Sequence, residues 1–217
     1  MLFRTIKNNL SFFFPYSLVL VALIPVLLIN SKPELHLLIN GYHNDFFDVF
    51  FKCITWIGDG IFIFVPVTIL LFFSVRHVVF VVSAYLSTGL ITQLLKRIFF
   101  NDVIRPSRLF ADEAQLHLVE GVRMLAGRSF PSGHATSAFA ICLSLALIVR
   151  NNTMKFIFFI IACLVAFSRV YLSQHFLIDV YVGSVIGITG ALVFYAVYYR
   201  NSRQWHSWNI LNIFHKR

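Results

Sequence analysis

Two short segments hold the residues whose types and spacing could do chemistry, Arg128–His134 and Ser168–Asp179. Each contains a histidine and an arginine, in a chain where only 12% of the residues are charged. His175 precedes Asp179 by four residues, so the two side chains would share one face of a helix. The carboxylate can then hold one ring nitrogen and leave the other free to attack. This spacing predicts an activated histidine.

A site for an anion is the second chemical feature. Ser132–His134 stands at the start of an apolar segment, and the backbone N–H groups at a helix N-terminus bind anions. Ionisable side chains near a membrane are costly and usually mark function. The cationic side chains expected on the same membrane face are Lys96, Arg97, Arg105 and Arg169. Arginine, lysine and a helix N-terminus that converge on one point predict a clamp for a phosphate group.

Each of these residues also has a simpler interpretation when it is taken alone. His134 could cap a helix, and His175 with Asp179 could form a structural hydrogen bond. Arg169 could extend its charged end to the membrane interface. These three simpler interpretations would all have to hold at once on one membrane face. Because that coincidence is improbable, the catalytic interpretation is favoured.

Two histidines at a phosphate site predict a transfer in two steps. His175 attacks phosphorus and forms a phosphohistidine, while Asp179 fixes its tautomer and stabilises the imidazolium. His134 protonates the leaving oxygen and then deprotonates the water that cleaves the intermediate. The sequence offers no carboxylate cluster suited to Mg²⁺, so we expect a reaction without metal or other cofactor.

The composition indicates an integral membrane protein. Of the 217 residues, 59% are hydrophobic, and the mean hydropathy is +0.79. A soluble domain carries about 25% charged residues, twice the share found here. The net charge of +9 does not indicate a nucleic-acid partner, because the basic residues are scattered between apolar segments. The expected partners are the bilayer and a lipid phosphate substrate, and no obligate protein partner is evident.

The apolar segments predict an all-α bundle of six transmembrane helices in one domain, residues 1–217, with a catalytic core at about 60–199. A bilayer crossing needs about 20 apolar residues. Residues 31–59 are expected as an outward-facing amphipathic segment in the interface, or alternatively as a lid packed beside the site. Residues 200–217 form a basic cytoplasmic tail. The six expected spans are 11–29, 60–75, 78–95, 132–149, 153–172 and 176–199.

Charge predicts the orientation of this bundle. With six spans, all nine acidic residues fall on the side opposite the termini. The termini side carries basic residues only. The positive-inside rule then places both termini in the cytoplasm and the site on the outer, periplasmic face. The small size and short loops favour the inner (plasma) membrane of a bacterium.

The motifs resemble those of the phosphatidic acid phosphatase type 2 family, which includes membrane lipid phosphate phosphatases and vanadium haloperoxidases. Its Pro-Ser-Gly-His motif stands at Pro131–His134, and its Ser-Arg-x5-His-x3-Asp motif is matched by Ser168, Arg169, His175 and Asp179. The resemblance implies a six-span membrane fold, a phosphohistidine on His175 and no metal. It also implies that Ser132, Gly133 and Arg169 bind phosphate.

The first motif of that family departs from its usual form, Lys-x6-Arg-Pro. Arg105 and Pro106 fit, but Lys96 lies two residues too early and Arg97 one residue too early. A bulge in residues 99–104 would let Lys96 reach the phosphate. We prefer Lys96 because its type matches, with Arg97 as the alternative.

The substrate is expected to be a phosphomonoester or diphosphate of a lipid, since the site opens at the bilayer surface. Similar bacterial enzymes act on undecaprenyl diphosphate, phosphatidylglycerophosphate, phosphatidate or lipid A phosphates, and the first and last of these are preferred here. Two alternatives are a phosphotransferase with a lipid hydroxyl acceptor and a non-catalytic lipid-phosphate-binding protein. Asp59 is expected to cap the second span. The remaining histidines are expected at the surface without partners: His36, His43, His77, His117, His206 and His215.

Overall fold

A computed structural model describes residues 2–111 and 116–200, and this part of the chain is helical without strands. The all-α prediction is therefore confirmed. The elements are α1 (Leu2–Lys7), α2 (Leu10–Ile29), α3 (Lys32–Asn40), α4 (Asp45–Ile54), the 3₁₀ turns η1 (Thr55–Gly58) and η2 (Gly60–Ile63), α5 (Phe64–Leu71), α6 (Val75–Leu94), the π-helical turn η3 (Leu95–Phe99), α7 (Pro106–Leu109), α8 (Gly133–Ile148), α9 (Asn152–Tyr171) and α10 (Leu177–Arg200).

Four described helices are long and apolar enough to cross a membrane: α2, α6 with η3, α9 and α10. A fifth candidate is the pair Asp45–Gly58 and Gly60–Leu71, whose arms are bent by 59°. The expected span 60–75 is thus only one arm of this pair. The span expected at 78–95 begins three residues earlier, because α6 already starts at Val75. α8 is apolar but has 16 residues, so the count of six spans stays a prediction.

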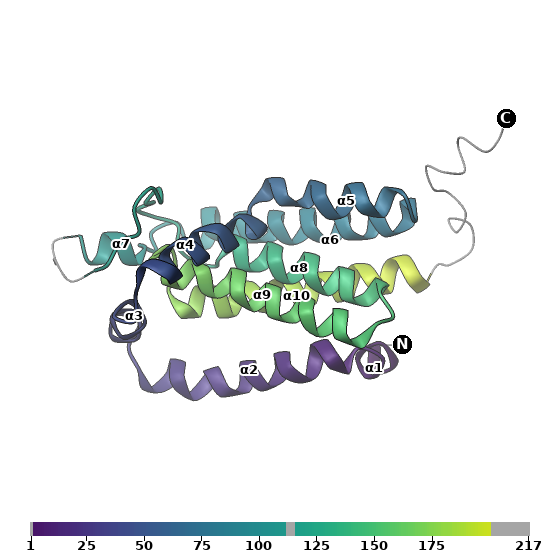
Figure 1. The fold of residues 1–217 in the computed structure, drawn as a ribbon, viewed down its shortest axis with the longest axis horizontal. Coiled ribbons are helices and arrows are strands. Elements are labelled where there is room, and N and C mark those ends of the chain that lie inside the picture. Colours follow the sequence, from purple (N-terminus) through teal and green to yellow (C-terminus); the bar gives the residue numbers. More distant parts are fainter. Residues whose placement is uncertain (1, 112–115, 201–217) are drawn as a thin grey trace.

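Helix α8 is the centre of the bundle and packs against α6, α9 and α10 (Figure 1). Two glycines let α10 approach it closely. A Cβ at Gly183 would lie 2.6 Å from the carbonyl oxygen of Ser132, and one at Gly187 would lie 2.5 Å from that of Thr136. Any side chain at these positions would push the helices apart. The close contact fixes the start of α10 beside the start of α8, where both motifs lie.

The two ends of the bundle differ in what they contain. Figure 1 shows the start of α2, the turn between α8 and α9 and the described end of α10 at one end. Helices α3, α4 and α7 lie at the other end, together with the loops of both motifs. This separation agrees with the arrangement expected from charge.

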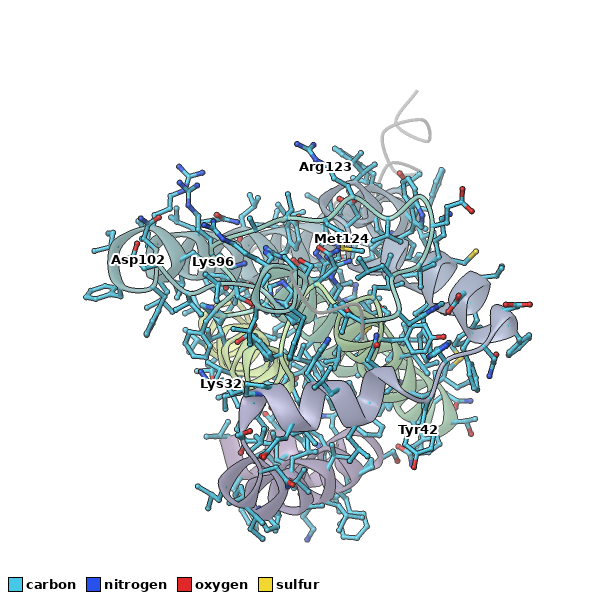
Figure 2. All side chains as sticks on the ribbon, turned by 90° about the vertical axis from the view of Figure 1, so that its left-hand side faces the viewer. Lys32, Tyr42, Lys96, Asp102, Arg123 and Met124 are labelled. Atoms are coloured by element: carbon cyan, nitrogen blue, oxygen red, sulfur yellow. The ribbon has the colours of Figure 1, made fainter. Side chains whose placement is uncertain are left out.

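Segment 31–59 forms two helices and a 3₁₀ turn rather than one amphipathic helix. Ser31 and Glu34 form a capping box at the start of α3, with the Ser31 amide 3.2 Å from Oε2 of Glu34. Asn44 caps α4 and accepts a hydrogen bond from the amide of Phe47 at 2.9 Å. Helix α3 then crosses over the motif end of the bundle (Figure 2). The segment contacts the loop before α10 through His36, whose Nε2 lies 3.1 Å from Oγ of Ser173.

Candidate active site

His175 and Asp179 meet at the junction of α9 and α10. His175 lies in the loop before α10, and Asp179 lies in the first turn of that helix. Nδ1 of the imidazole is 3.2 Å from Oδ2 of the carboxylate, and both side chains are buried. Nε2 faces Nη1 of Arg105 at 3.4 Å. The carboxylate thus holds one ring nitrogen and leaves the other toward the cationic side of the site.

Ser129 joins this pair, although no role was predicted for it beyond its place in the first segment. Its hydroxyl donates a short hydrogen bond to Oδ2 of Asp179 and lies 3.4 Å from Nδ1 of His175. The backbone amide of Phe176 donates to the same carboxylate oxygen at 3.1 Å. The Ser129 hydroxyl and the Phe176 amide therefore hold the same carboxylate oxygen that contacts Nδ1 of His175, and Ser129 is fully buried.

The Pro-Ser-Gly-His motif forms the N-terminus of α8. Ser132 is the N-cap, and its hydroxyl accepts from the amide of Ala135 at 3.4 Å. The Ser132 amide donates to the backbone oxygen of Asp179 at 2.9 Å, which ties the two motifs together. No other atom lies within 4 Å of a Cβ built on Gly133, so the backbone there borders open space. An anion could reach the free amides of this helix end.

His134, the next residue, has its ring against the 3₁₀ turn η1. A Cβ at Gly58 would lie 3.1 Å from Cδ2 of His134 and 2.6 Å from Cγ1 of Val165. Only glycine leaves room for the ring at this contact.

Asp59, which follows Gly58, makes no side-chain capping bond to the turn η2 that it precedes, so its expected role as a helix cap is wrong.

Arg105 and Arg169 are both buried within the site. Nη1 of Arg105 donates to the carbonyl oxygen of Gln174 at 2.8 Å, and its Nε donates to that of Gly127 at 3.0 Å. Nη1 of Arg169 donates to Oγ1 of Thr55 at 2.7 Å. Nε of Arg169 is buried without a hydrogen-bond partner among the described residues, which suits a group that awaits an anion.

The structure distinguishes Lys96 from Arg97. Lys96 is buried, with 6% of its surface exposed, and lies within electrostatic range of Arg105 and Arg169. Arg97 is exposed. Figure 2 shows Lys96 at the motif end of the bundle, with Arg123 pointing outward from the loop above it. Lys96, and not its neighbour, is therefore the residue brought to the site.

A π-helical turn accounts for one of the two extra residues in the first motif. In η3 the amide of Phe100 bonds to the carbonyl oxygen of Leu95 at 3.0 Å, one residue beyond the α-helical spacing. Such turns insert a residue without ending the helix and are frequent at functional sites. The helix deforms at Lys96 itself, and a bulge in residues 99–104 stays a prediction for the second extra residue. Pro106 is buried at the start of α7.

Charge and burial favour the neutral form of the His175 imidazole. Burial lowers the pKa of His175 well below its usual range, and the nearby cations Lys96, Arg105 and Arg169 lower it further. A neutral imidazole has a free electron pair on Nε2 and can act as a nucleophile. The described residues contain no group of three or more His, Cys, Asp or Glu side chains placed to hold a metal ion. Positive charge in the site comes from lysine and arginine.

The expectation that His36 lies at the surface is wrong. His36 is 2% exposed, and its Nε2 lies 3.1 Å from Oγ of Ser173, two residues before the reactive histidine. Asn40 donates to the same hydroxyl at 3.3 Å. Burial lowers the pKa of His36 to about 4. Helix α3 thus supports the loop that carries the site, which no local sequence pattern indicates.

His117 also has partners that the sequence did not indicate. Its Nε2 is 2.8 Å from Oδ2 of Asp48, and its ring stacks on that of His43 with centroids 3.9 Å apart. His77 is half-buried and stacks on Tyr199. His206 and His215, like the tail at 201–217, lie outside the described residues.

Comparisons with known proteins agree with this geometry. The model of the PAP2 superfamily matches residues 77–203. A lipid A 4'-phosphatase from Porphyromonas gingivalis is 28% identical over 183 residues, which cover 81% of this chain and 77% of the relative. The enzyme of the same name from Bacteroides thetaiotaomicron is 26% identical over 174 residues, 76% of this chain and 75% of the relative.

Two solved structures share the fold. The crystal structure of Aquifex aeolicus LpxE has a TM-score of 0.66 and 31% identity, over 74% of this chain and 92% of that one. A PAP2-type phosphatidylglycerolphosphate phosphatase from Bacillus subtilis has a TM-score of 0.66 and 21% identity, over 91% of this chain and 98% of that one, a likeness of fold alone. With its two motifs joined at one buried site and the family model matched over more than half its length, the chain belongs to the PAP2 superfamily.

Proposed function

We propose that this chain is a membrane lipid phosphatase that removes a phosphate from lipid A through a phosphohistidine on His175. The observation that carries the proposal is the placement of that imidazole between Asp179 and Arg105. One nitrogen is fixed by a carboxylate, and the other faces a cluster of cations. This is the arrangement required of a nucleophile that attacks a dianionic phosphate.

The first step forms a bond from Nε2 of His175 to phosphorus and breaks the bond from phosphorus to the lipid oxygen. His134 gives its proton to that leaving oxygen, so a neutral lipid alcohol departs. Lys96, Arg105 and Arg169 balance the charge on the three equatorial oxygens. The positive charge that develops on His175 is offset by Asp179.

The second step returns the enzyme to its starting state. A water molecule attacks phosphorus, His134 removes its proton, and the bond from phosphorus to Nε2 breaks. Inorganic phosphate leaves, and His134 is again protonated. The water replaces the proton that His134 gave to the lipid oxygen, so the two steps balance and the proposed reaction proceeds without a metal ion.

The relatives favour lipid A among the lipid phosphates. Two of them are named lipid A 4'-phosphatases, and the LpxE structure shares 31% of the aligned residues. Of the substrates expected from the sequence, the lipid A phosphate is the one these names support. We also infer that the chain is a single catalytic domain in a bacterial inner membrane, with its termini cytoplasmic and its site periplasmic.

The test is phosphate release by the purified protein in detergent, with a chelator present. The substrates are lipid A, undecaprenyl diphosphate, phosphatidylglycerophosphate and phosphatidate, each compared with the His175→Ala variant. His43→Ala is the matched control, since that histidine is exposed and its ring contacts His117 rather than the pair. We expect release from lipid A that His175→Ala abolishes and His43→Ala retains. No release until a lipid acceptor is added would identify a phosphotransferase, and binding without turnover would identify a carrier.

A further inference from the structure

An apolar groove of about 550 Å³ lies between α5, α8 and α9. Its walls are side chains such as Ile69 on α5, Leu145 on α8 and Phe158 on α9, and His77 is the one polar residue among those that line it. The mechanism makes no use of this volume. A groove of this size and character suits an apolar ligand.

The groove exists because α5 diverges from the bundle. The chain bends by 59° between Gly58 and Gly60, and α5 then packs against α6 (Figure 1). The face of α8 that α5 would otherwise cover is left open. Ile57 and Phe62, on either side of the bend, also line the groove.

One face of α8 connects the groove to the site. Its groove-lining residues follow helical spacing and are Ala138, Ile141, Cys142, Leu145 and Ile148. His134 precedes Ala138 by four residues and so stands at the head of the same face. Gly58 follows the groove-lining residue Ile57 and packs directly against the His134 ring. The groove therefore begins where the proposed general acid lies.

The chemistry of the proposed function places the lipid on this side. His134 protonates the leaving oxygen, and the leaving group is the lipid alcohol that carries the acyl chains. An acyl chain must therefore leave the site past His134. From Ala138 to Val149 the groove follows α8 for about 16 Å, at about 1.5 Å per residue. One leaflet of the hydrocarbon core is about 15 Å thick, so an acyl chain has a matching length.

We propose that this groove binds one acyl chain of the lipid phosphate substrate and so selects for long-chain substrates. The inference rests on the proposed function, because it takes the leaving group to be a lipid alcohol. Leu145 and Ile69 form opposite walls and set the width of the groove. They are specificity residues, remote from the reacting atoms.

The test narrows the groove from each wall with Leu145→Trp and Ile69→Trp. Leu145 is half-buried and Ile69 is 55% exposed, so a larger ring can fit at either position without replacing core packing. Leu86→Trp is the matched control, because Leu86 is 59% exposed on α6 and does not line the groove. The readouts are KM for lipid A and the inhibition constant of vanadate, which has no acyl chain. Melting curves in detergent verify the fold of each variant.

We expect KM to rise by about tenfold in both groove variants, through the loss of apolar contacts along one chain, with the vanadate constant unchanged. Leu86→Trp should match the unaltered protein. The inference is overturned if both groove variants keep the original KM, as they would if the groove held only bilayer lipid. It is also overturned if KM and the vanadate constant rise together. If the unaltered protein releases no phosphate, the proposed function itself fails, and the inference fails with it.

Discussion

Nδ1 of His175 lies 3.2 Å from Oδ2 of Asp179, and this contact determines which ring nitrogen can react. Ser129 and the amide of Phe176 bind the same oxygen, so the carboxylate cannot turn away. The second ring nitrogen is left to face Arg105 at 3.4 Å. The contact with Asp179 therefore orients the His175 ring so that its other nitrogen faces Arg105.

Asp179→Asn should lower kcat for lipid A by about a hundredfold or more, with KM little changed. The amide keeps the size of the side chain but loses the charge that offsets the imidazolium. The same exchange of the aspartate in Ser-His-Asp triads strongly lowers kcat. Asp48→Asn is the control, since Asp48 pairs with His117 away from the site. A kcat within twofold of the original protein would show that Asp179 is dispensable.

Ser129→Ala should lower kcat by about tenfold, because a buried carboxylate loses one of its charge-assisted hydrogen bonds. Ser144→Ala is the matched control. Ser144 is also fully buried, and its hydroxyl has no hydrogen-bond partner among the described residues. Steady-state kinetics on the two variants provide the comparison. Equal activities would mean that Ser129 fills space and does not position Asp179.

Lys96→Ala should reduce kcat/KM by about a hundredfold, and Arg97→Ala should change it by less than about threefold. Lys96 is buried beside the clamp, whereas Arg97 is exposed, where a charge contributes little. The same assay on both variants decides between them. A larger loss from Arg97→Ala would reverse the assignment of the first motif.

The acid side of the pH profile should show His175 active well below pH 6.5. The nucleophile must be neutral, and burial with the neighbouring cations lowers its pKa well below its usual range. As pH falls, protonation of His175 therefore begins only below the range in which a free histidine is protonated. The profile of kcat/KM reports groups of the free enzyme. The prediction fails if kcat/KM falls with a pKa near 6.5 and NMR shows that His175 is the group that takes up that proton.

The histidines show which parts of the site the sequence could predict. His175 and Asp179 lie in one motif whose spacing fixes their geometry locally, so the sequence sufficed to bring these two together. His36 reaches the site from α3, a contact across 137 residues with Ser173. Tertiary packing alone creates such contacts, and no periodicity in residues 32–40 records it.

The fold was predictable to a similar extent. Apolar length identified the helices α2, α6, α9 and α10, because a long apolar helix is the usual way to satisfy the backbone inside a bilayer. The bend at Gly58–Gly60 was missed, since the two short apolar arms appeared in sequence as an interfacial segment and a separate span. The π-helical turn at Lys96 was missed for a related reason: a single inserted residue leaves the apolar pattern almost unchanged.

Buried His36 should make the protein less stable in mild acid. Its pKa of about 4 in the folded state lies below the value of about 6.5 in the unfolded chain. Between these values the unfolded chain binds a proton that the folded one does not, so stability present above pH 6.5 is lost as pH falls toward 4. At pH 5 the loss is about 2 kcal/mol. The melting temperature of His36→Gln should fall less between pH 7 and pH 5 than that of the unaltered protein. An equal fall in both proteins would exclude His36 as the cause.

The most direct measurement of the central claim is a search for the covalent intermediate. Lipid A labelled in the scissile phosphate is mixed with the enzyme, turnover is stopped in base, where phosphohistidine survives, and the label on the protein is counted. We expect the unaltered enzyme to retain label at His175, located by peptide mass spectrometry, and His175→Ala to retain none. His134→Ala should accumulate more label if it still completes the first step, since it lacks the base that activates water. Rapid hydrolysis with no label on the protein at any mixing time would contradict the account.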